Sequence, residues 1–276
     1  MSETIPTTIA IKDIIPEAEG IKTFVFENKL KFKPGQFVML WIPGVDEKPF
    51  GTWNVEPGTW NITVSAVGTF SQKLHELKVG DKVGIRGPFG KGFSIPKGKK
   101  IVLVGGGFGT APLLGLAAAA AKDCELNFII GARSSNLLFG KAHAEKLGAN
   151  VQIATDDGSA GEKGFATDLL EKILKAEGPA PAKAEGPAPA KAGVYSCGPE
   201  LMLRKVAEIC VEKNIPCELS LERFMKCGIG VCGSCVMDDV GFCVCKDGPV
   251  IAGEKALKLT EFGKYRRDSV GERQEL

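Results

Sequence analysis

The chain has 276 residues, of which 44% are hydrophobic and 25% charged, so it is long enough for two domains and has an ordinary globular composition. Its formal net charge of +2 gives no reason to expect a nucleic acid or an anionic membrane as a partner. Residues 1–12 lack the basic and apolar regions of a signal peptide, and the longest apolar run, 111–121, is too short to cross a bilayer. We therefore expect a cytoplasmic protein that binds neither nucleic acid nor membrane.

Residues 1–97 are predicted to form an antiparallel β-barrel domain. Short apolar segments separated by turn residues recur along this region, at 21–26, 36–42, 60–66 and 82–86. Strands at this spacing are typical of a small antiparallel barrel or sandwich. Within the region we expect one helix, over residues 70–77.

Residues 98–215 are predicted to form a Rossmann-like α/β domain. Residues 100–104 are continuously apolar, as in the buried strands of parallel sheets, and lead through a glycine-rich turn into an Ala/Leu-rich helix. Further strands are expected at 125–130 and 151–155 and at a segment ending at Cys197, with a helix over 200–214. Strands that alternate with helices indicate a doubly wound sheet.

The glycine-rich turn is a candidate nucleotide site. Unpaired N–H groups at the start of a helix, together with the helix dipole, attract anions. The turn lacks the G-x-G-x-x-G fingerprint, so a tight packing turn with no ligand remains an alternative. The candidate residues are Gly105, Gly106, Gly107, Gly109 and Thr110.

Two further segments, one rich in Pro and Ala and one charged, are predicted to be exposed. Residues 176–191 hold two copies of the octad Ala-Glu-Gly-Pro-Ala-Pro-Ala-Lys, which cannot build a core and is predicted to be an exposed, semi-rigid insertion in the α/β domain. Residues 254–276 are strongly charged, and we expect a solvated tail.

The cysteines indicate metal chemistry. Nine cysteines is an odd number, and five of them fall between residues 227 and 245, which argues against a secreted disulfide scaffold. The spacing C-x4-C-x2-C, with a later cysteine, is that of a plant-type ferredoxin 2Fe–2S site. A structural zinc site is the alternative, although zinc favours paired C-x2-C knuckles and the segment contains one such pair.

The cysteine segment also has the glycines that wrapping a chain around a cluster requires. Gly228, Gly230 and Gly233 can adopt positive φ angles without a Cβ penalty. Cys243 and Cys245 compete for the fourth ligand position.

The order of barrel, nucleotide-type α/β domain and cysteine segment resembles the electron-transfer subunits of class 1B dihydroorotate dehydrogenase, a branch of the ferredoxin reductase family. The resemblance is carried by residues 105–112, 155–159, 195–199 and 222–250. It implies a small cluster domain over 216–253 in which the fourth ligand is the cysteine before Asp-Gly-Pro-Val. The implied metal ligands are therefore Cys227, Cys232, Cys235 and Cys245.

The same resemblance implies FAD in the barrel domain. The family's Arg-Pro-x-Ser stretch corresponds to residues 48–52, with lysine for arginine and glycine for serine. A Gly-Thr pair follows, at the start of the expected helix. The implied FAD residues are Lys48, Pro49, Phe50, Gly51, Thr52, Thr63, Val64, Ser65, Gly68 and Thr69.

NAD is implied at the α/β domain, through the glycine-rich turn and the residues Cys197, Gly198 and Pro199. NADP stays open as an alternative, because Arg133 and Ser134 follow the second strand and no acidic residue stands there to hold a ribose diol. A solvated loop charge is the competing interpretation of Arg133.

The function implied by the resemblance is electron relay by an oxidoreductase subunit. A partner subunit carrying FMN would oxidise dihydroorotate to orotate in pyrimidine biosynthesis, and electrons would pass through 2Fe–2S and FAD to NAD, in a heterotetramer with two copies of each subunit. Two alternatives remain. One is a related FAD and 2Fe–2S subunit of a sulfhydrogenase or of an NADH-dependent ferredoxin:NADP oxidoreductase; the other is a zinc-stabilised, non-redox binding protein.

Overall fold

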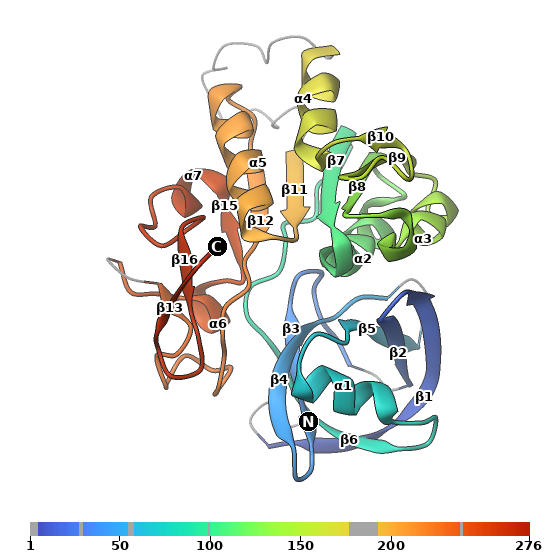
Figure 1. Ribbon diagram of the computed structural model, residues 1–276, viewed down its shortest axis with the longest axis vertical. Coiled ribbons are helices and arrows are strands. Elements are labelled where there is room, and N and C mark those ends of the chain that lie inside the picture. Colours follow the sequence, from blue (N-terminus) through green and yellow to red (C-terminus); the bar gives the residue numbers. More distant parts are fainter. Residues whose placement is uncertain (1–4, 28–29, 55–57, 99, 177–192, 238–239) are drawn as a thin grey trace.

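The computed structural model describes residues 5–27, 30–54, 58–98, 100–176, 193–237 and 240–276. Most of the predicted insertion at 176–191 lies outside these residues. The barrel lies below the α/β region in Figure 1, and the C-terminal residues run alongside both. Among the described residues, no helix is long and apolar enough to cross a membrane.

The N-terminal region is a six-stranded antiparallel sheet in the order β4-β3-β6-β1-β2-β5. Two backbone hydrogen bonds between Trp53 and Asn61, of 2.8 and 3.1 Å, join the segment after β4 to β5, so the ends of the sheet meet as in a barrel. The elements are β1 (Thr7–Ala18), β2 (Ile21–Glu27), β3 (Phe37–Ile42), β4 (Asp46–Gly51), β5 (Thr59–Ser65), α1 (Thr69–Glu76) and β6 (Lys82–Phe89).

Two barrel strands have no counterpart in the sequence prediction. β1 contains Pro16 and several charged residues, and its pairing with β2 is interrupted by irregularities. β4 is a polar edge strand in which Pro49 is tolerated because one side of the strand makes no ladder hydrogen bonds. Neither strand has the clean alternation that the prediction relies on.

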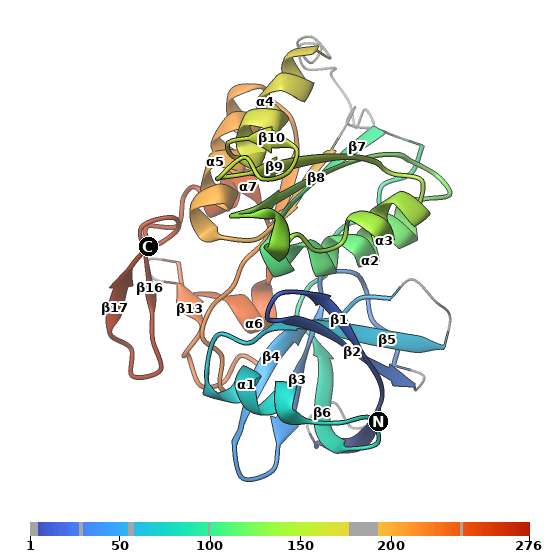
Figure 2. The ribbon, with the colours of Figure 1, turned by 45° about the vertical axis from the view of Figure 1, so that its right-hand side comes forward.

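The α/β region is a seven-stranded sheet in the order β10-β9-β8-β7-β11-β12-β15, parallel except for β15. In Figure 2 α2 and α3 lie on the side that faces the barrel, and α4 and α5 on the other. The elements are β7 (Lys100–Gly106), η1 (Gly107–Gly109), α2 (Thr110–Ala120), β8 (Glu125–Ala132), η2 (Ser135–Leu137), α3 (Lys141–Lys146), β9 (Asn150–Thr155), β10 (Glu162–Lys163), α4 (Ala166–Ala176), β11 (Gly193–Cys197), α5 (Glu200–Glu212), β12 (Cys217–Ser220) and β15 (Val250–Ala252).

Strand β7 shows why this sheet is covered on both faces. Ile101 and Leu103 belong to the same apolar cluster as the α2 leucines, whereas Val102 and Val104 belong to the cluster that contains the buried residues of α4 and α5. Successive side chains of a strand point to opposite faces, so a strand between two helix layers must be apolar at every position. The predicted buried parallel strand is confirmed.

The cysteine segment is an excursion from one edge of this sheet. β12 and β15 pair antiparallel, and residues 221–249 leave the sheet after β12 and return at β15. The expected boundary at residue 215 therefore falls before the last two strands of the α/β sheet, because β15 supplies an edge partner from beyond the cysteines. The segment contains β13 (Val236–Met237), β14 (Phe242–Cys243) and the helical turn α6 (Val244–Asp247).

The prediction of a solvated tail over 254–276 is wrong for its first half. Ala256, Leu259 and Phe262 are buried in the same core as α5, because they interrupt the charges with one apolar face. After α7 (Gly253–Ala256) the chain ends in a hairpin of β16 (Tyr265–Arg267) and β17 (Arg273–Glu275).

Candidate functional site

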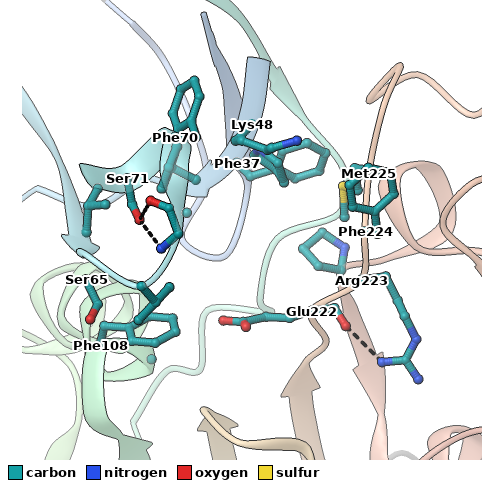
Figure 3. Close-up of a pocket in the computed structure, with 18 of the residues that line it drawn as sticks. Phe37, Lys48, Ser65, Phe70, Ser71, Phe108, Glu222, Arg223, Phe224 and Met225 are labelled. Atoms are coloured by element: carbon teal, nitrogen blue, oxygen red, sulfur yellow. Dashed lines mark hydrogen bonds between the residues drawn. The ribbon is translucent and has the colours of Figure 1, made fainter. Parts of the chain in front are cut away.

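A cavity of about 850 Å³ lies where the barrel, the α/β sheet and the C-terminal residues meet. Figure 3 shows Ser65, Phe70 and Ser71 on one side of this space and Phe224 and Met225 on the other. The barrel contributes β4, β5 and the start of α1; the α/β region contributes the turn before α2 and the end of β11. Residues 220–225 and the C-terminal hairpin complete the lining. Its volume is in the range of small-molecule and cofactor sites.

Many of the residues assigned to cofactors by the sequence line this one cavity. They are Lys48, Pro49, Phe50, Gly51, Thr63, Val64, Ser65, Gly68, Thr69, Gly109 and Cys197. The others assigned to FAD or NAD do not line it: Thr52, Gly105, Gly106, Gly107, Thr110, Gly198 and Pro199. Thr52 is buried instead, and its N–H and its hydroxyl both donate to the carbonyl of Gln36, at 3.1 and 3.0 Å.

Close packing accounts for the glycine-rich turn. A Cβ at Gly105 would lie 2.6 Å from Oγ1 of Thr110, and one at Gly106 would lie 2.6 Å from Cδ of Pro199. A Cβ at Gly109 would lie 2.7 Å from the Cys197 carbonyl oxygen. The turn is therefore pressed against the end of β11, and both meet at the carboxyl edge of the sheet, where open α/β sheets bind their ligands.

Gly51 stands where the barrel approaches helix α2. A Cβ at this position would lie 3.0 Å from Cγ of Pro112, which is closer than most side chains tolerate. The glycine at the position of the family's serine therefore has a structural reason in this chain. Beside it, Nζ of Lys48 lies 2.5 Å from Oδ2 of Asp46 and 5.0 Å from the centre of the Phe224 ring.

The first turn of α1 faces the cavity. Gly68 begins the helix with extended backbone, its N–H donates to Oγ of Ser71 at 3.0 Å, and the Ser71 hydroxyl donates back to the Gly68 carbonyl at 2.9 Å. The rings of Phe50 and Phe70 are stacked with centroids 5.9 Å apart. The cavity thus combines aromatic surface with a helix N-terminus that favours anions.

A carboxylate and a thiol also face this space. Desolvation by the surrounding protein is the main cause that raises the pKa of Glu222 to about 7; Glu200 adds to the rise and Arg266 opposes it. Burial and the nearby Glu222 raise the pKa of the Cys197 thiol, and a hydrogen bond with Ser220 lowers it. Cys197 is therefore a neutral thiol at the edge of the cavity.

Three cysteine sulfurs lie together in the cysteine segment. Sγ of Cys243 is 3.6 Å from that of Cys235 and 3.8 Å from that of Cys245, and all three lie within 4.8 Å of one another. The sulfurs of Cys227 and Cys232 are outside this group. Of the predicted ligands, the structure thus brings Cys235 and Cys245 together, with Cys243 beside them.

Backbone N–H groups point at the sulfurs. The Gly230 N–H donates to Sγ of Cys245 at 3.1 Å, and the Cys245 N–H donates to Sγ of Cys235 at 3.4 Å. Burial raises the pKa of Cys227, but backbone donors including Cys232 and Val231 outweigh it and bring the pKa to about 6. Such donors stabilise thiolates and are characteristic of the sulfurs around an iron–sulfur cluster.

The backbone of the cysteine segment tests two predictions: that its glycines have positive φ angles, and that Cys243 and Cys245 compete for one ligand position. Gly228, Gly230 and Gly233 have φ angles of +74°, +81° and +74°, as predicted. Cys243 and Cys245 are two positions apart, so an extended chain would also place them on one face. The chain turns helical at Val244, and the Cys243 sulfur lies near those of both Cys235 and Cys245.

The cysteine segment packs directly against the barrel. Nη2 of Arg86 donates to the Cys227 carbonyl at 3.1 Å, and a Cβ at Gly228 would lie 2.9 Å from Cγ of Met39. Residues 221–225, which line the cavity, lead into Cys227. One continuous chain segment therefore joins the lining of the cavity to the first cysteine of the cysteine segment.

Sequence reasoning missed the contribution of the C-terminal hairpin, whose lining residues are Arg266, Arg267, Asp268, Ser269 and Gln274. Tyr265-Arg266-Arg267 is recognisable as a basic run, but nothing in its spacing points to the cavity. Arg133 and Ser134 do not line the cavity; the Ser134 hydroxyl lies 2.5 Å from Oδ1 of Asn136.

Comparison with solved structures defines the class of protein. A structure of the NADH-dependent reduced ferredoxin-NADP oxidoreductase has a TM-score of 0.76 and 26% sequence identity, covering 89% of this chain and 88% of that chain. The ferredoxin reductase of carbazole 1,9a-dioxygenase has the same fold, with a TM-score of 0.63 at 20% identity over 76% of this chain and 67% of that one. The chain is thus a ferredoxin reductase-like electron transfer protein.

Sequence comparison gives the family. Residues 222–256 match the iron-sulfur cluster binding domain of dihydroorotate dehydrogenase B, which favours an iron–sulfur cluster over zinc. A probable dihydroorotate dehydrogenase B (NAD(+)) electron transfer subunit from Methanocaldococcus jannaschii is 46% identical over 97% of this chain and 98% of its own length. The corresponding protein of Methanothermobacter thermautotrophicus is 41% identical over 99% and 98%. The chain belongs to the family of dihydroorotate dehydrogenase B (NAD(+)) electron transfer subunits.

Proposed function

We propose that this protein passes electrons from an FMN-containing dihydroorotate dehydrogenase catalytic subunit to NAD+, by way of a 2Fe–2S cluster and FAD. The complex is a cytoplasmic heterotetramer with two copies of each subunit, and it serves pyrimidine biosynthesis. The cluster exchanges single electrons, whereas the flavin exchanges one or two and so connects the cluster to nicotinamide, which takes a hydride. The protein supplies the positions and the electrostatic surroundings of these groups.

One observation carries the proposal: residues 221–225 line the cavity and lead directly into Cys227, and strand β3 borders both, with Phe37 at the cavity and Met39 against Gly228. The donation from Arg86 to the Cys227 carbonyl, at 3.1 Å, fixes the start of the cysteine segment on β6. Rapid electron transfer requires redox groups to be close, and this connection holds the two candidate cofactor sites next to each other. It supports a relay between them.

The residues that line the cavity fit a flavin dinucleotide. Thr63, Val64 and Ser65 end strand β5 beside the aromatic pair Phe50 and Phe70, which offers a flat surface to a planar ring. The Gly68 N–H is bonded to Ser71, and the N–H groups that follow it in the first turn of α1 are offered to a pyrophosphate. Lys48 adds a positive charge, partly balanced by Asp46.

The thiolates and their backbone donors fit an iron–sulfur cluster. Three sulfurs lie within 4.8 Å of one another, and the N–H groups of Gly230 and Cys245 point at the sulfurs of Cys245 and Cys235. We propose that Cys227, Cys232, Cys235 and Cys245 are the ligands.

Coexpression with a dihydroorotate dehydrogenase catalytic subunit from the same genome tests the function. We expect the two chains to copurify, and the complex to reduce NAD+ with dihydroorotate as the electron donor. The chain alone should contain iron and flavin, show the visible spectrum of both, and leave dihydroorotate unoxidised. Copurification with a catalytic subunit of another kind would contradict the assigned reaction, and a colourless protein containing zinc would contradict the relay.

A further inference from the structure

The C-terminal hairpin lines the cavity through residues of β16, of its turn and of β17. In its register Arg266 is paired with Gln274, and Arg267 with Arg273. Side chains of paired residues lie on the same face of a hairpin, and successive pairs alternate. Arg266 and Gln274 both line the cavity. Of the next pair, Arg267 also lines it, whereas Arg273 does not and lies over the Tyr265 ring, 4.5 Å from its centre.

The position of the hairpin is fixed at its base. The Gly263 N–H donates to Oε1 of Glu200, at 2.8 Å, and Phe262 is buried. Nε of Arg267 lies 3.4 Å from Oε1 of the buried Glu261. Figure 2 shows β16 and β17 standing beside β13 at the edge of the molecule.

The turn that joins β16 to β17 is held by hydrogen bonds to Asp268. The Asp268 carboxylate accepts the N–H groups of Val270 and Glu272, at 2.9 and 3.0 Å, and closes the turn. Asp268 lines the cavity, but its carboxylate is already hydrogen-bonded to N–H groups of its own turn. The hairpin is a formed element whose cavity face is set by the fold.

Of the described residues, four cationic side chains line the cavity, and three of them have carboxylate partners. Lys48 pairs with Asp46, Arg223 with Glu200, and Arg267 with Glu261. Figure 3 shows the Arg223 side chain directed away from the central space. Among the residues that the structure describes, Arg266 has no carboxylate within 4 Å; Glu222 attracts it from farther away.

We propose that Arg266 is an anchor for the phosphates of a dinucleotide, and that the C-terminal hairpin is part of the binding site. An arginine whose charge is not neutralised by a nearby carboxylate, on the face of a fixed hairpin, suits a pyrophosphate, which it can bind with two N–H groups. The inference rests on the proposed function, because the dinucleotides in question are FAD and NAD. Both carry a pyrophosphate, so the experiment separates them.

The test compares full-length Arg266→Gln with Arg273→Gln, which removes the same charge from the opposite face of the same hairpin. FAD affinity is measured by the flavin fluorescence released on dilution, and NADH affinity by titration of the FAD-loaded protein. We expect Arg266→Gln to raise one of the two dissociation constants at least about tenfold, because it removes the charged donor that binds the pyrophosphate. Arg273→Gln should change neither, and Arg266→Lys should recover part of the loss.

The two arms identify which dinucleotide is bound. A change confined to FAD places its pyrophosphate at the hairpin, and a change confined to NADH places the nicotinamide dinucleotide there. If the parent and Arg266→Gln bind both FAD and NADH with equal affinity, the inference is overturned. It is also overturned if Arg266→Gln and Arg273→Gln lose affinity to the same extent. A parent protein that binds neither FAD nor NADH would overturn the proposed function as well, so the two failures are distinguishable.

Discussion

The carboxylate of Glu200 is shared by the guanidinium of Arg223 and the backbone N–H of Gly263. Arg223 donates through both terminal nitrogens, one of them at 2.9 Å, and Gly263 donates at 2.8 Å. Glu200 begins α5, Arg223 precedes the cysteines and Gly263 precedes the C-terminal hairpin. One carboxylate therefore ties together three segments that surround the cavity.

We predict that Glu200→Ala destabilises the protein by about 3–5 kcal/mol, because it leaves the Arg223 charge buried without a partner. The side chains of Arg223 and Glu200 are 3% and 10% exposed. The matched control is Glu208→Ala on the same helix, whose ion pair with Arg204 lies at the surface and should matter by less than about 1 kcal/mol. Denaturant unfolding of both variants gives the comparison; similar losses would show that Glu200 does not hold these segments together.

A second prediction concerns the contact between Gly51 and Pro112. Gly51→Ser restores the family's hydroxyl but places a Cβ 3.0 Å from the Pro112 ring. We expect a loss of about 1–3 kcal/mol in unfolding free energy, as for other overpacked contacts. Combining it with Pro112→Ala should recover part of the loss, and the double-mutant cycle should give a favourable coupling. Additive effects would mean that the glycine is not required by this contact.

Features set by local patterns could be predicted from the sequence. The alternation in β2 and β5, the continuous apolar strand β7 and the glycines around the cysteines all depend on residues close together in the chain. The order of the regions followed from these patterns. The predicted strand starting at Lys100 and the predicted helix starting at Glu200 are confirmed within a few residues at their ends.

Features that depend on distant partners could not be predicted. The pairing of β12 with β15 joins strands on either side of the cysteine segment, and the bond from Gly263 to Glu200 joins residues 63 positions apart. β16 consists of Tyr-Arg-Arg, a composition equally typical of a solvated tail. The contribution of the hairpin to the cavity is therefore a tertiary result with no local signal.

A third prediction separates Cys243 from Cys245, whose sulfurs lie 3.8 Å apart. We expect Cys245→Ser to lose the cluster, because that sulfur accepts the Gly230 N–H at 3.1 Å and the cysteine occupies the family's fourth ligand position. Cys243→Ser should keep its iron. The measurements are iron content and the visible spectrum of each purified variant.

The two cysteine variants also test the order of the relay. NADH should still bleach the flavin of Cys245→Ser, because that hydride step does not need the cluster, while coupled turnover with the catalytic subunit should be lost. Loss of iron from Cys243→Ser with retention in Cys245→Ser would reverse the ligand assignment. Coupled turnover in an iron-free protein would remove the cluster from the pathway.

The last prediction follows from the Glu222 carboxyl, whose pKa in the folded protein is raised from its ordinary 4.5 to about 7. The folded protein therefore holds this proton more tightly than the unfolded chain does. The resulting stability is present in full below about pH 4.5 and is lost as the pH rises to about 7. Glu222→Gln cannot ionise, so its melting temperature relative to the ligand-free parent should rise between pH 5 and pH 8.

Two further variants show whether the surroundings of Glu222 cause this effect. Glu212→Gln, on α5 and not among the residues that line the cavity, should follow the parent at both pH values. Arg266→Gln should extend the loss of stability above pH 7, because Arg266 is the positive charge that lowers the Glu222 pKa, whereas Glu200 raises it. A melting-temperature difference between Glu222→Gln and the parent that stays constant from pH 5 to pH 8 would contradict the raised pKa. If the difference changes but Arg266→Gln leaves it unaltered, the two side chains do not interact across the cavity, and the hairpin lies farther from Glu222 than this structure places it.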